Sequence, residues 1–250
     1  MKKTLQEVRD YIYEGVYDPG IFKAFFLAGG PGSGKTFVTQ SAFAGTGLKL
    51  VNSDVKFERD LRKANLSLKM PDEEKYFRDR IRQSAKEFAG KQMDTYLKGR
   101  LGMIVDSTAR DYPSIQRQYN LLRNIGYDCY MIFVNTSLEV ALERNRTRTR
   151  RVPEDITRKS WQTVQNNIGK FQTTFGRSNF IIVDNNNASE NILHKLWTRV
   201  RGLVRAPVKS GIAKRWMQQQ LAIRTHIKKW EKEKSKAWYK KIDPIAKGYR

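Results

Sequence analysis

The feature that most constrains this chain is a glycine-rich octapeptide, Gly29 to Thr36, with the sequence GGPGSGKT. It matches the pattern G-x-x-x-x-G-K-[ST] at every fixed position. An apolar run, residues 23–28, precedes it, and a helix-compatible segment from Lys35 to about Phe43 follows it. A strand, a glycine-rich loop and a helix in this order are typical of a phosphate-binding loop. The alternative is a glycine-rich turn that only joins a strand to a helix.

The residue types in this loop predict a nucleotide site. Backbone amides and the positive end of the following helix dipole are expected to face phosphate oxygens. Lys35 is expected to reach the β and γ phosphates, and the Thr36 hydroxyl to bind Mg²⁺. We therefore predict ATP and Mg²⁺ as cofactors. The expected nucleotide contacts are Gly30, Pro31, Gly32, Ser33, Gly34, Lys35 and Thr36.

Strand-like and helix-like segments alternate along the first two hundred residues. The expected strands are 23–28, 49–52, 103–105, 127–134 and 180–183. The expected helices are 35–43, 72–97, 112–125, a helix opening at 138–144, 153–171 and 189–204. This alternation predicts an α/β fold with a mainly parallel sheet that is covered by helices on both faces. Within 72–97 we expect Phe77, Ile81, Ala85 and Phe88 to share one helix face.

The chain is strongly basic. Its 48 Lys and Arg against 25 Asp and Glu give a net charge of +23, and the last fifty residues alone contain 15 basic and three acidic residues, a net of +12. This surplus favours a polyanionic partner such as nucleic acid. We expect a kinase-like domain, residues 1–206, and a basic amphipathic helical tail, residues 207–250. The tail contains Trp238, and its expected apolar face is Ile212, Trp216, Ile223, Ile227 and Trp230.

Neither membrane insertion nor export is indicated. No stretch approaches the roughly 18 consecutive apolar residues of a membrane span, and the polar segment Met1 to Asp10 has no apolar signal core. We therefore expect a cytoplasmic protein without a membrane partner. The single cysteine, Cys129, cannot form an internal disulfide, and its apolar surroundings predict a buried core thiol.

Two aspartates follow strands next to the phosphate loop. Asp54 is expected to end the second strand, and Asp106 the third. Because ligands of open α/β sheets bind at the carboxyl ends of the strands, both carboxylates should open onto the loop. One can accept a proton from an attacking hydroxyl group, and the other can hold metal-bound water or substrate. Alternatively, Asp54 is a helix N-cap, and Asp106 is a Walker B aspartate that binds magnesium.

A third feature is a run of five arginines within eight residues, 144–151. Repulsion between like charges makes this run a poor independent helix and favours a mobile lid over a polyphosphate. There, guanidinium groups can stabilise the charge on a transferring phosphoryl group. A solvated basic loop that contacts only nucleic acid phosphates is the alternative. The arginines are Arg144, Arg146, Arg148, Arg150 and Arg151.

Together these motifs resemble the P-loop kinases grouped around bacteriophage polynucleotide kinase and the zeta toxins, over roughly Phe22 to Asp184. The resemblance rests on four parts in the same order: the phosphate loop, a strand ending in Asn-x-Asp, a strand ending in Asp-x-Thr, and a lid of the form Arg-Asn-x-x-x-Arg-x-x-x-Val-Pro. Beyond the loop, the matching residues are Asn52, Asp54, Asp106, Thr108, Arg144, Asn145, Arg148, Val152 and Pro153.

The resemblance implies a role for each candidate site residue. Asp54 would be the general base for an acceptor hydroxyl, and Arg148 the lid arginine on the ATP phosphates, with Arg144 as a further nucleotide contact. Asp106 and Thr108 would line the acceptor site. With Lys35, the expected catalytic residues are Asp54 and Arg148. The implied fold is a P-loop kinase-like α/β sheet with an arginine-rich lid and a basic C-terminal helical extension.

The leading functional hypothesis is an ATP-dependent kinase of a hydroxyl group on nucleic acid, with DNA favoured over RNA. The acceptor would be a 5′-hydroxyl end or a hydroxymethylated base in phage DNA, and the location the host cytoplasm if a phage encodes the chain. A zeta toxin-like kinase of a nucleotide sugar is one alternative. A nucleic-acid-dependent packaging or translocation ATPase is another, although Asp106 is followed by Ser107 rather than glutamate. A nucleotide-gated binding protein is a third.

Overall fold

The computed structural model describes residues 15–106, 108–149, 151–187 and 189–247, with side chains up to residue 237. The segment Met1 to Asp10, Ser107, Arg150 and the side chain of Trp238 lie outside this description. The strands are β1 (Lys23–Ala28), β2 (Lys49–Val51), β3 (Met103–Asp106), β4 (Asp128–Asn135) and β5 (Phe180–Asp184). The α-helices are α2 (Lys35–Ala42), α3 (Ser53–Lys63), α4 (Lys75–Lys98), α5 (Tyr112–Asn124), α6 (Leu138–Thr147), α7 (Glu154–Asn166), α8 (Ile168–Phe175), α9 (Glu190–Arg205) and α10 (Gly211–Lys247). Short 3₁₀ helices are η1 (Asp72–Glu74) and η2 (Arg177–Asn179).

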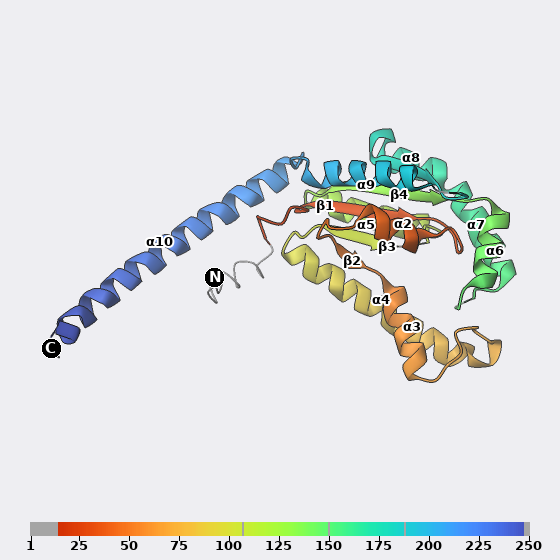
Figure 1. Cartoon of the computed structure of the whole chain (residues 1–250), viewed down its shortest axis with the longest axis horizontal. Coiled ribbons are helices and arrows are strands. Elements are labelled where there is room, and N and C mark those ends of the chain that lie inside the picture. Colours follow the sequence, from red (N-terminus) through yellow and green to blue (C-terminus); the bar gives the residue numbers. More distant parts are fainter. Residues whose placement is uncertain (1–14, 107, 150, 188, 248–250) are drawn as a thin grey trace.

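The five strands form one parallel sheet in the order β2-β3-β1-β4-β5 (Figure 1). The central strand β1 is buried along its whole length. Because every pairing is parallel, the carboxyl ends of all strands meet at one edge, where the loop after β1 lies. The predicted α/β fold with a parallel sheet is therefore confirmed.

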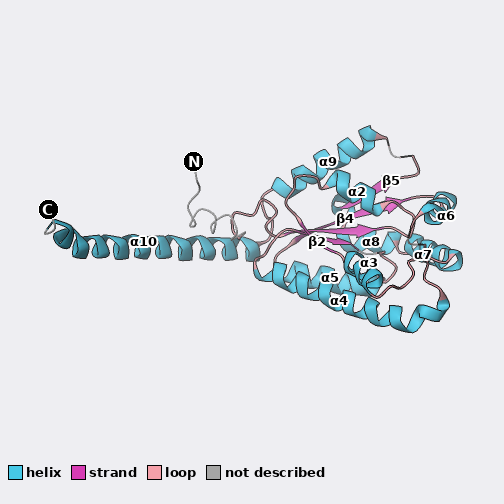
Figure 2. Ribbon diagram, turned by 60° about the horizontal axis from the view of Figure 1, so that its bottom comes forward, coloured by secondary structure: helices cyan, strands magenta, loops and turns pink. Residues whose placement is uncertain are grey.

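Helices cover both faces of the sheet (Figure 2). On one face, α2 and α9 bury Val38, Ala42, Leu196 and Val200 against the strands. On the other face, α4, α5 and α8 pack in a second cluster that includes Cys129. Cys129 is 2% exposed, which confirms the prediction of a core thiol. Apolar burial on both faces explains why the strands are continuous hydrophobic runs rather than alternating ones.

Asp54 does not end the second strand, so that prediction is wrong. Strand β2 stops at Val51, and Asn52 caps the next helix by accepting a hydrogen bond from the Asp54 backbone amide, at 2.6 Å. Asp54 lies in the first turn of α3, where a negative side chain is favoured by the helix dipole. The N-cap is therefore Asn52 rather than Asp54. Helix α3 was not expected from the sequence.

The helix expected over 153–171 is divided in two. It breaks at Asn167, between α7 and α8. The Asn167 side chain is 5% exposed, and its Nδ2 donates to the carbonyl oxygens of Ala109 and Arg110 at 3.3 and 3.1 Å. These bonds tie the break to the loop that follows β3, so a tertiary contact ends a helix that the local sequence would continue.

The buried face of α4 agrees only in part with the expected one, at Ile81 and Ala85. Its buried side chains are Ala85, Ala89 and Met93. Phe77 and Phe88 remain 60% and 40% exposed. Ala85 and the partly buried Ile81 pack in the cluster with α3, whereas Ala89 and Met93 pack in the cluster on the sheet.

Helix α10 begins against the domain and then projects away from it (Figure 1). Ala213 is fully buried, and the Trp216 ring lies 5.4 Å from that of Phe22. Further along, Arg224 lies 5.0 Å from the Tyr17 ring. The division at residues 206 and 207 remains a prediction, but the first turns of the tail pack on the preceding domain. Of the helices in the described segments, none has the length and apolar character needed to cross a membrane.

Candidate active site

The loop between β1 and α2 folds back on itself, and its glycines are structurally required. Gly32 and Gly34 have φ values of 79° and 82°, in the region that favours glycine. A Cβ at Gly32 would lie 2.0 Å from the Ala141 carbonyl oxygen. Gly30 lies against the Trp161 backbone, because a Cβ atom added to Gly30 would lie 3.5 Å from the Trp161 Cα. Close backbone packing therefore fixes the shape of the predicted phosphate loop.

The polar groups of this loop lie at the carboxyl edge of the sheet. Lys35 Nζ donates to the Gly29 carbonyl oxygen at 2.7 Å, so the lysine folds back over the loop. Thr36 is exposed in the first turn of α2, and Ser33 Oγ is buried without a hydrogen bond among the described residues. The seven predicted nucleotide-contact residues thus occupy one loop and the first turn of the following helix.

Asn185, which the sequence analysis missed, fastens the loop to the end of β5. Its Nδ2 donates to the Ser33 carbonyl oxygen at 2.7 Å, and it would lie 2.3 Å from a Cβ at Gly34. The signal for it was its position directly after β5, since every strand end at this edge approaches the loop. Asn185 is 3% exposed, so this contact is part of the interior.

Arg144 of α6 is aimed at the same loop. Its Nη2 donates to the Asn186 carbonyl oxygen at 3.0 Å, which holds the guanidinium in place. Its Nη1 is buried, makes no hydrogen bond within the described segments, and lies 3.6 Å from the Cβ position of Gly34. A buried cationic donor without a partner next to a phosphate loop suits an anionic ligand.

Asp106 ends β3 beside the loop lysine. Its Oδ2 accepts from Asn52 Nδ2 at 2.7 Å, whereas its Oδ1 is buried and makes no hydrogen bond within the described part of the chain. Burial raises the pKa of Asp106, the Lys35 charge opposes this rise, and the nearby Asp54 charge adds to it. The charges of Lys35 and Asp54 therefore both act on the Asp106 carboxyl group.

Asp54 is paired with an arginine that the sequence analysis did not single out. Arg82 of α4 donates from Nη1 to Asp54 Oδ1 at 2.5 Å. The Arg82 guanidinium carbon lies 3.6 Å from the centre of the Phe57 ring, so the arginine also makes a cation–π contact with this ring. The two partner side chains are 30% and 44% exposed, at the rim of the site. No local pattern links residues 28 positions apart on different helices.

Two predicted site residues are not joined to this centre by any described contact. Thr108 is exposed, two residues after the end of β3. Arg148 is exposed directly after α6, and within the described ranges no hydrogen bond or ion pair links its side chain to the phosphate loop. Their assignments remain predictions.

The donor set fits a magnesium ion bound together with phosphates. Among the described residues, no three His, Cys, Asp or Glu side chains form a cluster that could hold a metal by themselves. The Thr36 hydroxyl and the buried Asp106 Oδ1, which has no hydrogen-bond partner among the described residues, are hard oxygen ligands. Mg²⁺ typically takes one or two such protein ligands and completes its shell with phosphate and water oxygens.

The parallel sheet, the loop between β1 and α2, and the aspartate beside the loop lysine define a P-loop enzyme of the kinase type. Residues 25–171, more than half of the chain, match the AAA_33 family model, described as an AAA domain. The chain therefore belongs to this family, and it is an ATP-dependent phosphotransferase.

Several solved structures have a similar fold. A protein of Chloroflexus aurantiacus j-10-fl with a provisional kinase name is 17% identical, with a TM-score of 0.51 over 74% of this chain and 97% of its own. The AvrRxo1-ORF1:-ORF2 structure with ATP is 15% identical, with a TM-score of 0.50 over 82% and 73%. Shikimate kinase from Acinetobacter baumannii in complex with shikimate is 14% identical, with a TM-score of 0.45 over 73% and 92%. Such identities establish the shared fold alone. The comparison with curated proteins gave no match.

Proposed function

We propose that this chain transfers the γ-phosphoryl group of ATP to a hydroxyl group carried by nucleic acid, as its resemblance to polynucleotide kinase and zeta toxins implies. The observation that carries the proposal is the arrangement of Asp54 and Asp106. Asn52 connects them, because its Oδ1 accepts from the Asp54 amide and its Nδ2 donates to the Asp106 carboxylate. Two carboxylates linked through Asn52, one at the end of β3 and one in the first turn of α3, suit transfer to an alcohol better than simple nucleotide binding.

On the nucleotide side, the loop amides and Lys35 would bind the β and γ phosphates. Thr36 and Asp106 would hold Mg²⁺, which neutralises phosphate charge when bound. The unpartnered Arg144 Nη1 would contribute a further donor to the phosphates. One solved structure of similar fold, AvrRxo1-ORF1:-ORF2, is recorded with ATP. That record supports ATP as the donor here, together with the loop itself.

On the acceptor side, Asp54 would take the proton of the attacking hydroxyl group. The hydroxyl oxygen would form a bond to the γ phosphorus as the bond between that phosphorus and the β–γ bridging oxygen breaks, and ADP would leave. Arg82 would fix the direction of the Asp54 carboxylate through Oδ1. Asp106 and Thr108 would line the acceptor position, and Arg148 would stabilise charge on the transferring group.

The polymeric nature of the acceptor is supported by charge. The net charge is +23, and the exposed part of α10 carries Lys228, Lys229, Lys232, Lys234 and Lys236 against Glu231 and Glu233. Trp230, among these lysines, is 56% exposed. Lys234 Nζ lies 4.0 Å from the centre of this ring, so one face of the ring is covered by Lys234 and the other would be the face that stacks on a base. A kinase of small metabolites needs no such surface.

The test is incubation with γ-labelled ATP and separate acceptors: 5′-hydroxyl oligonucleotides of DNA and of RNA, duplex DNA with hydroxymethylated bases, and nucleotide sugars. We expect label in a nucleic acid and none with Lys35→Ala. Label in the nucleotide sugar alone would replace the proposal with the zeta toxin-like alternative. Polymer-stimulated phosphate release without labelled polymer would favour an ATPase instead.

Polymer binding by the tail has its own test. Replacing Lys228, Lys229, Lys232 and Lys236 by Gln should lower the slope of log K against log salt by roughly 0.7 to 0.9 for each phosphate contact that is lost. The matched control is the pair Glu231→Gln and Glu233→Gln, which alters the same helix but removes no cation. An unchanged slope in the lysine variant would exclude the tail from the polymer interface.

A further inference from the structure

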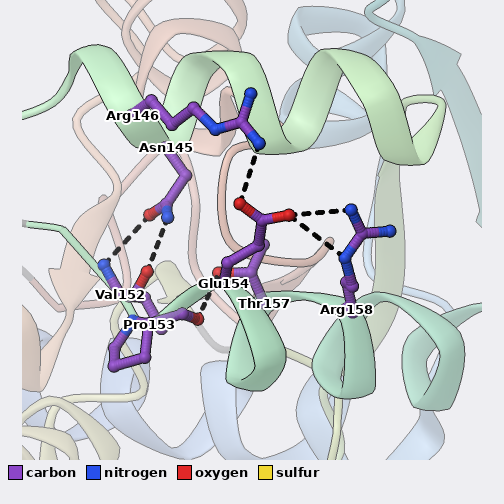
Figure 3. Close-up of polar contacts among 7 residues, drawn as sticks. All are labelled: Asn145, Arg146, Val152, Pro153, Glu154, Thr157 and Arg158. Carbon is purple, nitrogen blue, oxygen red and sulfur yellow. Dashed lines mark hydrogen bonds and ion pairs between the residues drawn. The ribbon is translucent and has the colours of Figure 1, made fainter.

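Asn145, near the end of α6, makes an unusual pair of contacts with the start of the next helix. Its side-chain Nδ2 donates to the Val152 carbonyl oxygen at 2.6 Å, and its Oδ1 accepts from the Val152 amide at 3.1 Å (Figure 3). A side-chain amide has the same donor and acceptor as a peptide group, so Asn145 pairs with Val152 as a neighbouring strand would. Asn145 is only 4% exposed. The amide thereby joins residues 145 and 152, and we call the residues between them the arginine loop.

A set of ion pairs between exposed side chains also links the end of α6 to α7. Arg146 Nη2 lies 2.8 Å from Glu154 Oε2, and the other oxygen of Glu154 lies 2.7 Å from Arg158 Nη2 (Figure 3). All three side chains are exposed, so each ion pair contributes little by itself. The two hydrogen bonds of Asn145 are partly buried, so water competes for them less than for the exposed ion pairs. Asn145 is therefore the principal closure of the loop.

The closure determines which arginines the loop presents. Arg146 is engaged by Glu154, and Arg151 Nε donates to the Arg148 carbonyl oxygen at 3.4 Å. Among the described residues, the Arg148 guanidinium makes no hydrogen bond or ion pair, and the side chain is exposed. Mutual repulsion of these cations would open an unfastened loop. The Asn145 contacts oppose that repulsion, and among the described arginines of the loop Arg148 is the one with an exposed side chain that makes no hydrogen bond or ion pair.

We propose that Asn145 is a positioning residue that presets the arginine loop, so that Arg148 reaches the nucleotide phosphates without first ordering a flexible segment. A preset loop contributes to rate because the conformational entropy of ordering has already been lost on folding. The inference rests on the proposed function in one respect, the assignment of Arg148 to the phosphates. The closure itself is a property of the loop.

The test is a double-mutant cycle on phosphotransfer, with ATP hydrolysis measured in parallel. Asn145→Leu keeps the branched shape of the side chain but removes both hydrogen bonds. We expect kcat to fall by roughly 10²-fold, the loss typical of a displaced catalytic group, with a smaller change in the KM for ATP. In an Arg148→Ala background, the same substitution should change kcat by less than about twofold, since neighbours that act through one another are not additive. Thr149→Ala, in the same loop, is the matched control.

Two further readouts separate positioning from a general loss of structure. Trypsin should cleave within residues 146–151 faster in Asn145→Leu than in the parent chain, while the melting temperature of the domain stays close to the parent value. Asn145→Ser, which cannot reach both groups of Val152, serves if the leucine variant does not fold, and we expect the same pattern from it.

The outcomes distinguish the inference from the function on which it rests. Unchanged turnover in Arg148→Ala would remove the phosphate assignment and this inference with it. Reduced turnover in Arg148→Ala, combined with a full additional loss in the double variant, would overturn the inference alone. Unaltered cleavage of the loop in both Asn145 variants would overturn it as well.

Discussion

The ion pair between Arg82 and Asp54 allows a positioning role of Arg82 to be distinguished from a stabilising one, because the pair is expected to contribute little to the free energy of unfolding. The Nη1–Oδ1 distance is 2.5 Å, but the two side chains are 30% and 44% exposed. Exposed pairs of this kind contribute about 0.2 to 1 kcal/mol. The contact of Arg82 with the Phe57 ring adds about 0.5 to 1 kcal/mol. Arg82→Gln should therefore reduce the free energy of unfolding by no more than about 2 kcal/mol.

The expected effect on turnover is larger. A general base contributes about 10² to 10⁴ to the rate, and that contribution depends on the direction of its carboxylate. In Arg82→Gln, kcat is therefore expected to fall about 10- to 10²-fold, with the KM for ATP nearly unchanged. The assay combines steady-state transfer from labelled ATP with urea unfolding of the same samples. Arg82→Lys should lie between the parent and Arg82→Gln.

Arg80→Gln, on the same helix, is the matched control, because Arg80 contacts Tyr76 instead of the site. Parent-like turnover in Arg82→Gln would refute the positioning role. So would a loss of turnover that merely tracks the loss of folded protein. In either case Arg82 would be a structural link between α3 and α4.

Three further predictions concern the site and the core. Asp54→Asn should lower kcat by about 10² to 10⁴ with ATP binding retained in a titration; loss of ATP affinity instead would make Asp54 a nucleotide-side residue. Burial is the main cause of the raised pKa of Asp106, so the folded chain favours the protonated carboxyl group. The stability that this group contributes is therefore complete below the ordinary pKa of 3.8 and is lost as the pH rises through the raised pKa. Asp106→Asn should therefore raise the melting temperature at pH 7 but not below pH 3.8, while phosphotransfer falls; a lower melting temperature at pH 7 would contradict this. Burial raises the pKa of Cys129 to about 12, so a thiol reagent at pH 8 should label it only after unfolding, and rapid labelling of the folded chain would show that the core opens.

The sequence was informative where the determinants are local. The phosphate loop carries its own pattern, and the expected strand 23–28 coincides with β1 because apolar residues there are flanked by clear breakers. The helix break at Asn167 could not be predicted in this way. It depends on carbonyl groups almost sixty positions earlier in the chain.

The candidate site was predicted in part for the same reason. Lys35 and Asp106 follow from the rule that strand ends meet at one edge. Arg82 and Asn185 required the spatial order of helices and strands, since their partners Asp54 and Ser33 are 28 and 152 positions away. Asp54 was identified as a site residue although its local structure was predicted wrongly, because Asn52 turns the chain into a helix without moving Asp54 away from the edge.

The attachment of α10 has a geometric consequence for how the chain handles a long substrate. Trp216 contacts Phe22, just before β1, so the helix leaves from the edge opposite the phosphate loop. At the usual rise of a strand, β1 separates the two edges by about 20 Å. At the usual rise of a helix, α10 extends about 55 Å. A polymer bound, as proposed, along the outer part of α10 would be tethered at a distance from the catalytic centre. The helix would then raise the effective concentration of acceptor groups at the site without aligning any one of them, and the choice of hydroxyl would depend on the residues proposed to line the acceptor site, Asp54, Asp106 and Thr108.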